Sequence, residues 1–147
     1  MAISPEYLSE NETWQNRLEA LVQGLSDANL AQPMEAGWTV SAVLAHLAFW
    51  DIRIVTLLQK WQNEGVVGPS VVDSDVINEV SRHICLAVPA RTAAEMAFSW
   101  GRKANEAIAA LTPAQAAEIQ EKAANVRLDR THHRQDHIEG ISKALGL

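Results

Sequence analysis

The chain has 147 residues, a length that suits one domain and is short for two. Its composition, 48% hydrophobic and 20% charged residues, is ordinary for a globular protein and too apolar for a disordered one. The net charge of -6 and the scattered basic residues argue against a nucleic-acid partner, because nucleic-acid binding needs a concentrated cationic face. The single cysteine, Cys85, excludes an intrachain disulfide and is expected to be a small buried hydrophobe.

The first half of the chain predicts two long helices. Ser9 and Glu12 form a capping-box pattern that predicts the start of the first helix, and apolar residues then recur at helical spacing. A loop is expected over residues 26–38. Thr39 predicts the cap of a second helix, which runs to about residue 63 and ends before Gly65.

The second half of the chain predicts four further helices. They are expected from Ser74 or Asp75 to just before Pro89, from a capping-box pattern at 92–95 to Leu111, from Thr112-Pro113 through Ile119, and from about Val126 to Leu145. No segment alternates apolar and polar residues over the length of a strand. We therefore expect a single all-α domain over residues 1–147, a four-helix bundle with an additional short helix.

The most apolar stretch, residues 40–58, is interrupted by His46, Asp51 and Arg53, which favours a buried helix over a membrane span. Since the N-terminus shows no signal-peptide pattern, we expect a cytoplasmic protein with no membrane partner. The helix also carries a second apolar stripe opposite the first, at Ala45, Phe49, Ile52 and Thr56. We interpret this stripe as a homodimer contact; the alternative is that other helices of the domain surround it.

Three histidines form a candidate metal site. His133 and His137 are four residues apart, so their rings lie on one face of the last helix, where two imidazoles can reach one zinc-like ion. That face is otherwise apolar, and an unpartnered buried imidazole costs about 1–3 kcal/mol. His46 completes the set if the second and last helices are neighbours; hydrogen-bonded core histidines are the alternative. His132 is expected at the surface or the rim, and His83 is a minor candidate.

Other polar residues are candidates for supporting roles. Asp129, four residues before His133, is the first candidate to accept a hydrogen bond from the second ring nitrogen of a ligand. Asp51 and Asp136 are interpreted as ordinary solvated carboxylates. Arg53 lies on the side of its helix near His46 and could bind a carboxylate group, although a solvated arginine is the simpler interpretation.

Two motifs resemble the DinB/YfiT-like metalloenzyme family. One, similar to the family's second-helix signature, is GWTV at 37–40 with VLAHLA at 43–48 and Trp50-Asp51. The other, similar to its closing motif, is HRQDHI at 133–138 with Ile141. Asn78 also resembles an asparagine that is often seen on the third helix of that family. The resemblance spans nearly the whole chain.

This resemblance implies a four-helix bundle, commonly dimeric, with a divalent metal held by three histidines, which by position are His46, His133 and His137. Zinc and nickel are the usual metals, and nitrogen ligands do not choose between them. Several relatives, including the mycothiol-dependent maleylpyruvate isomerases and the bacillithiol transferases, use a low-molecular-weight thiol as co-substrate. The implied function is a thiol-dependent S-transferase or isomerase acting on a small electrophile, in which the metal lowers the pKa of the thiol.

Two other classes of function remain open from the sequence. One is a metal-dependent hydrolase, and the other is a non-enzymatic metal-binding or dimeric interaction module. The residues identify no general acid or base, so the catalytic residues are unknown. The loops at 26–38 and 63–73 are expected to shape the mouth of the substrate pocket.

Overall fold

The computed structural model describes residues 5–147, and within that range the chain is all-α, as predicted: 76% is helix and no β-strand occurs. Its elements are α1 (Glu6–Gln23), α2 (Asp27–Leu30), the 3-10 turn η1 (Glu35–Gly37), α3 (Val40–Glu64), α4 (Ser74–Ala87), α5 (Ala90–Ala109), α6 (Pro113–Lys122) and α7 (Thr131–Leu145).

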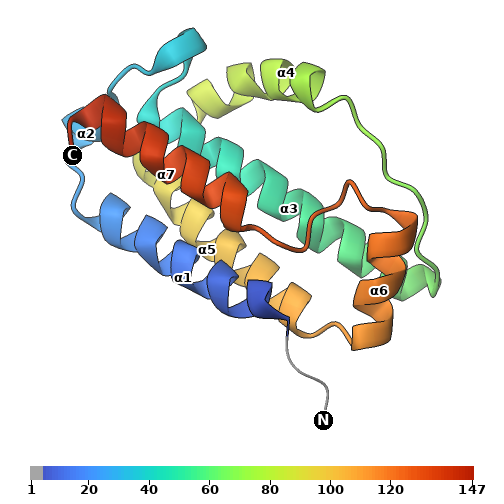
Figure 1. The fold of residues 1–147 in the computed structure, drawn as a ribbon. Helices are drawn as coiled ribbons and strands as arrows, with labels where there is room; N and C mark the ends of the chain where they lie inside the picture. Colours follow the sequence, from blue (N-terminus) through green and yellow to red (C-terminus); the bar gives the residue numbers. More distant parts are fainter. Residues whose placement is uncertain (1–4) are drawn as a thin grey trace.

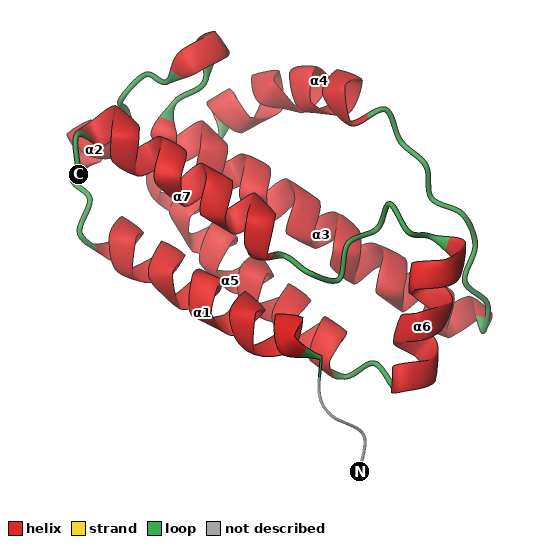
Figure 2. Cartoon of the chain, in the orientation of Figure 1, coloured by secondary structure: helices red, strands yellow, loops and turns green. Residues whose placement is uncertain are grey.

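The central element is α3, which packs against α5, α4 and α7, while α1 lies against α5 and α7 (Figure 1). The long helices α1, α3, α5 and α7 thus lie side by side. In Figure 1, α4 runs along the outer side of α3, and α6 sits at the end of the molecule where α3 finishes. The two longest connections, residues 65–73 and 123–130, run as loops between these helices (Figure 2).

Several predicted helix ends are confirmed. The Thr39 side chain accepts a hydrogen bond from the backbone N–H of Ala42 at 3.1 Å, and α3 begins at the next residue. Gly65 ends α3 in the left-handed conformation, with φ 70°, which favours glycine because it has no side chain. Thr112 and Gln115 form a reciprocal capping box at the start of α6.

Two helices start directly after a proline, ahead of their predicted starts. The first helix begins at Glu6, directly after Pro5, so Ser9 lies inside it and donates to the Glu6 carbonyl at 3.0 Å. In the same way α5 begins at Ala90 after Pro89 and not at residues 92–95. Proline disfavours helical geometry in the residue before it, so a helix can start directly after a proline without any side-chain cap.

The predicted loop at 26–38 contains the short helix α2. Ser26 and Asn29 satisfy each other's backbone N–H groups in a capping box, with both distances at 3.1 Å. This local pairing supplies enough hydrogen bonds for one helical turn, which a reading of apolar periodicity does not detect.

The last helix is shorter than predicted, because it begins at Thr131 and not near Val126. Residues 123–130 are non-helical, and α1 holds them in place. The Asn11 side chain donates to the Leu128 carbonyl at 3.0 Å and accepts from the Arg130 N–H at 2.8 Å. Val126 is buried in the core from this loop, so its apolar character does not report a helix.

The core consists of two clusters that share α3. One cluster surrounds the first half of α3 and includes Cys85, which is buried as predicted. The other packs Ile54, Leu58 and Trp61 against α6 and the loop before α7. Of the helices in residues 5–147, α3 alone is long and apolar enough to cross a membrane by length and composition, and more than half of that stretch is buried inside the protein.

Candidate metal centre

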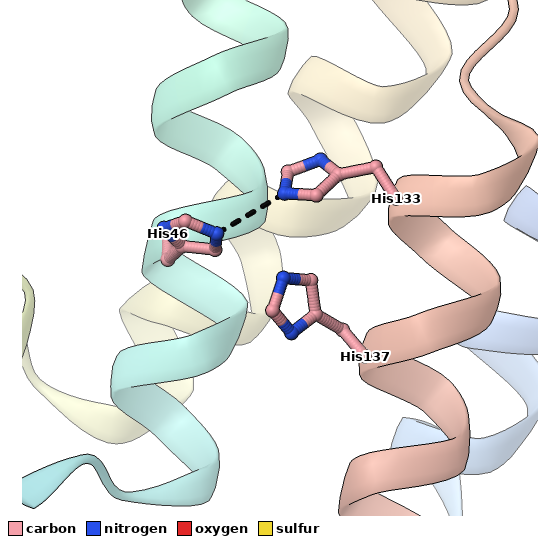
Figure 3. A group of neighbouring side chains, drawn as sticks. All are labelled: His46, His133 and His137. Carbon is pink, nitrogen blue, oxygen red and sulfur yellow. Dashed lines mark hydrogen bonds between the residues drawn. The ribbon is translucent and has the colours of Figure 1, made fainter. Parts of the chain in front are cut away.

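The structure brings the three predicted histidines together. His46 projects from α3, and His133 and His137 project from α7, with all three rings facing one another (Figure 3). One ring nitrogen from each lies within 4.8 Å of the other two. The Nε2 atoms of His46 and His133 are 3.1 Å apart, and the His137 ring centroid is 4.8 Å from that of His46 and 4.9 Å from that of His133. This cluster could hold a metal ion.

Local structure explains how the rings meet. His133 and His137 are one turn apart on α7, and α7 packs beside α3. Trp38 forms one wall of the site, with its ring edge-on to His46 at a centroid distance of 5.3 Å. Gly37, which has φ 80°, allows the sharp turn that brings Trp38 to this position.

Burial keeps the three imidazoles neutral. Desolvation, reinforced by His137 and Arg130, lowers the pKa of His46 to about 4. Desolvation and the nearby Arg130 lower the pKa of His133 to about 2. The pKa of His137 is also lowered by burial, against a smaller opposing effect of Asp136. Because metals bind the unprotonated ring, these groups are ready to bind a cation at neutral pH.

A short chain of contacts connects Arg130 to the histidines. Arg130 Nη2 lies 3.4 Å from His133 Nδ1, and the Nε2 atoms of His133 and His46 face each other at 3.1 Å. A guanidinium can only donate, so Nδ1 is the acceptor in a hydrogen bond between Arg130 and His133. His46 Nδ1 is buried and has no hydrogen-bond partner among the described residues.

Asp51 is buried, and its interpretation as a solvated carboxylate is wrong. It is 2% exposed and pairs with two arginines, Arg130 Nε at 3.0 Å and Arg134 Nη2 at 3.6 Å. Arg134 also donates to the Asn11 carbonyl at 2.8 Å and to Asn105 Oδ1 at 2.7 Å. This network was not predicted from the sequence. The one indication of it in the sequence is that Asp51 lies within an apolar stretch. The network joins α3 to the start of α7 next to the histidines.

Asp129 does not support a histidine. Its Oδ1 accepts from the backbone N–H of Thr131 at 2.9 Å, at the first residue of α7, where the N–H groups have no partner within the helix.

Asp136 is exposed, as predicted. His132 is exposed at the rim of the site, also as predicted, whereas His83 lies outside the cluster with Nε2 3.9 Å from a Glu79 carboxylate oxygen.

The histidines open onto a cavity of about 1160 Å³. Residues of the 26–38 segment and of the 65–73 loop contribute to its lining, which confirms that both loops shape the pocket. Apolar side chains form much of the wall: Met34, Trp38, Val43, Trp50, Ile54, Val71 and Val72. This volume accommodates a small organic molecule beside the three rings.

One polar wall of the cavity is built from α3 and α4. Trp50 Nε1 donates to Asn78 Oδ1 at 2.9 Å, which connects the two helices. Arg53 is half-buried and not simply solvated, since its Nη2 donates to the carbonyl and to the hydroxyl of Ser70, both at 2.9 Å. Burial and the nearby Arg130 lower the pKa of Arg53.

Comparison of the chain with protein-family models, with curated proteins and with solved structures finds no match. What the chain does is therefore inferred from its residues and their arrangement.

Proposed function

We propose that this protein is a metal-dependent enzyme whose divalent cation is bound by His46, His133 and His137. The observation that carries the proposal is the meeting of three neutral imidazoles, from two helices, at the wall of a large cavity.

The donor set fits a zinc or nickel ion. Two nitrogens bound to one zinc-like ion lie at most about 4 Å apart, because each bond is roughly 2.0–2.1 Å long. The ring nitrogens here lie within 4.8 Å of one another, so small ring rotations suffice. Imidazole suits both metals, and three nitrogen ligands leave a coordination position for a substrate or water.

The proposed reaction is thiol-dependent transfer or isomerisation on a small electrophile. A divalent cation at this site would supply Lewis acidity that lowers the pKa of a thiol near neutral pH. The chain's own thiol does not serve, because Cys85 is buried in the core and does not line the cavity, and burial raises its pKa. The co-substrate is then an external low-molecular-weight thiol, held against the apolar part of the cavity wall.

The arrangement of the helices supports membership of the DinB/YfiT-like family. The four long helices α1, α3, α5 and α7 are compatible with the four-helix bundle of that family, and α2, α4 and α6 are additional to it. A homodimer contact is proposed through α3, where Phe49 and Thr56 are exposed. The proposed location is the cytoplasm, where low-molecular-weight thiols are kept reduced.

The test is turnover of a panel of small electrophiles by the zinc- or nickel-loaded protein, with mycothiol or bacillithiol present or omitted. We expect product only with both metal and thiol, and none from the H133A/H137A variant. The H83A variant is the matched control, because His83 is exposed, lies outside the cluster and lines no part of the cavity. Turnover that needs the metal but no thiol would instead indicate a hydrolase. Metal binding without any turnover would indicate a binding module.

A further inference from the structure

The cavity has a positive lining although the chain as a whole is acidic. Four cationic side chains line it, namely Arg53, Arg127, Arg130 and Lys143, against two carboxylates, Glu35 and Asp129. The net charge of the chain is -6, so this concentration of positive charge is local. A concave, partly apolar site with an excess of one sign of charge attracts small molecules of the opposite sign.

The four cations are not equally available to a ligand. Arg130 is paired with Asp51, and both groups are buried. Arg53 forms no ion pair with any carboxylate in residues 5–147, and its contacts with Ser70 use only the Nη2 protons. A guanidinium has five N–H donors, so Nε and Nη1 of Arg53 each keep an N–H that can donate to an anionic oxygen.

Arg53 is also held in a fixed position. Its guanidinium lies over the Trp50 ring, 5.5 Å from the ring centroid, and the Trp50 ring is itself fixed by Asn78. The Ser70 carbonyl that accepts from Arg53 also accepts from the Asn125 side chain, so the loops on both sides support the group. A preorganised donor loses less entropy when it binds a ligand than a solvated arginine does.

The spacing along α3 relates Arg53 to the histidine cluster. His46, Trp50 and Arg53 lie at positions i, i+4 and i+7, on one face of the helix, and all three line the cavity. Seven residues of helix rise by about 10 Å, so roughly two turns separate the rings from the guanidinium. A molecule that reaches both ends crosses the apolar wall between them.

We infer that the cavity binds a small organic acid, with its carboxylate or phosphate group on Arg53 and its apolar body toward the three histidines. The part of this inference that concerns a reaction at the histidines rests on the proposed function. The part that concerns binding of the anion does not, because Arg53 and the cavity wall are present without a metal. The same anionic oxygens occur in carboxylates and in phosphate esters.

The test is calorimetric titration with three probes of matching shape: 2-naphthoate, 2-naphthyl phosphate and the neutral 2-naphthamide. For the wild-type protein we expect at least one of the two anions to bind about tenfold or more tightly than the amide, since charge-assisted hydrogen bonds exceed neutral ones. The tighter of the two anions identifies the acid class. The R53Q variant should lose the preference for an anion, and R53K, which keeps the charge but not the planar guanidinium, should retain part of it.

The R17Q variant is the matched control, because Arg17 also lies over a tryptophan, Trp14, with a distance of 4.5 Å to its ring centroid, but lines no part of the cavity. It should keep the preference. The inference is overturned if the wild type binds all three probes equally or if R53Q keeps the preference. Loss of the preference in H133A/H137A, but not in R53Q, would place the anion at the metal centre. If the protein proves to bind no metal, the proposed function fails while the anion preference still stands.

Discussion

Asp51 is a buried carboxylate shared by two guanidinium groups next to the histidine cluster. Because one negative charge faces two positive ones, the region keeps a net positive charge that is also felt by the rings: Arg130 contributes to the lowered pKa of both His46 and His133. Asp51 therefore joins α3 to the start of α7 beside the site.

Replacing Asp51 by asparagine should destabilise the protein strongly. The D51N variant leaves Arg130 and Arg134 buried without a countercharge, and loss of one partner from a buried ion pair costs about 3–5 kcal/mol. Denaturant unfolding measures the change in the free energy of unfolding. The D136N variant, at an exposed carboxylate on α7, should leave stability unchanged. A D51N variant as stable as D136N would contradict this role of Asp51.

The metal-free protein should lose stability as the pH falls below about 6.5. Burial lowers the pKa of His46 from 6.5 to about 4 and that of His133 to about 2, so between pH 6.5 and 4 the unfolded chain binds protons that the folded chain does not. Each such histidine contributes a slope of about 1.4 kcal/mol per pH unit. Above pH 7 this contribution is constant, because the rings are neutral in both states.

The measurement is the free energy of unfolding of chelator-treated protein between pH 4 and 8. Compared with wild type, H133N should show a shallower dependence on pH by about one histidine's contribution. The exposed H132N serves as its control. Equal slopes for H133N and wild type would show that His133 protonates as readily in the folded chain as in the unfolded one.

At the scale of helices, α1 and α5 approach closely at Gly101. This glycine faces the amide of Gln15, which is fully buried and donates to the Ala97 carbonyl at 3.2 Å. A Cβ atom at residue 101 would overlap the Gln15 side chain. The absence of a side chain at Gly101 therefore sets the distance between the two helices.

The G101A variant should lose about 1–3 kcal/mol of stability through this overlap. G140A is the matched control within a helix: its Cβ would lie 3.6 Å from Met34 Cε, an ordinary contact. It should be neutral or stabilising by up to about 1 kcal/mol, because alanine favours helix over glycine. Thermal or denaturant unfolding of the two variants decides, and a G101A variant as stable as G140A would show that α1 and α5 can separate without cost.

Helix boundaries were predictable where a local signal is strong. Thr39, Gly65 and Thr112 each satisfy or terminate backbone groups of the helix they flank, so their positions could be inferred from neighbouring residues alone. The Ser9 pattern misled because the same spacing occurs inside a helix, where the serine donates to the preceding turn. The start of α7 was missed because Asn11, distant in sequence, holds residues 128–130 out of the helix.

The residues of the candidate site were likewise predictable only in part. The three histidines were predictable because helical spacing and apolar neighbours place them inside the domain. The pairing of Asp51 with Arg130 and Arg134 was not, because it depends on α3 meeting the loop before α7, and no local pattern encodes that contact. The same holds for Arg53, whose position is fixed by Ser70 of the 65–73 loop.

At the scale of the whole molecule, α3 joins the two core clusters. Its first half packs in one cluster and its second half in the other, so neither cluster is complete without this helix. We therefore expect residues 1–147 to unfold as one cooperative unit. Far-ultraviolet circular dichroism and tryptophan fluorescence should give the same denaturant midpoint. Two separated midpoints would show that the clusters are independent and would contradict a single domain.

The central claim, that one cation is bound by three histidines from α3 and α7, is tested most directly by the metal content of the purified chain. After loading with zinc or nickel and desalting, elemental analysis should give one ion per wild-type chain. The H132A control should bind the same amount, while H133A/H137A should bind none and remain folded by circular dichroism. Equal metal content in the wild type and in H133A/H137A would contradict the assignment.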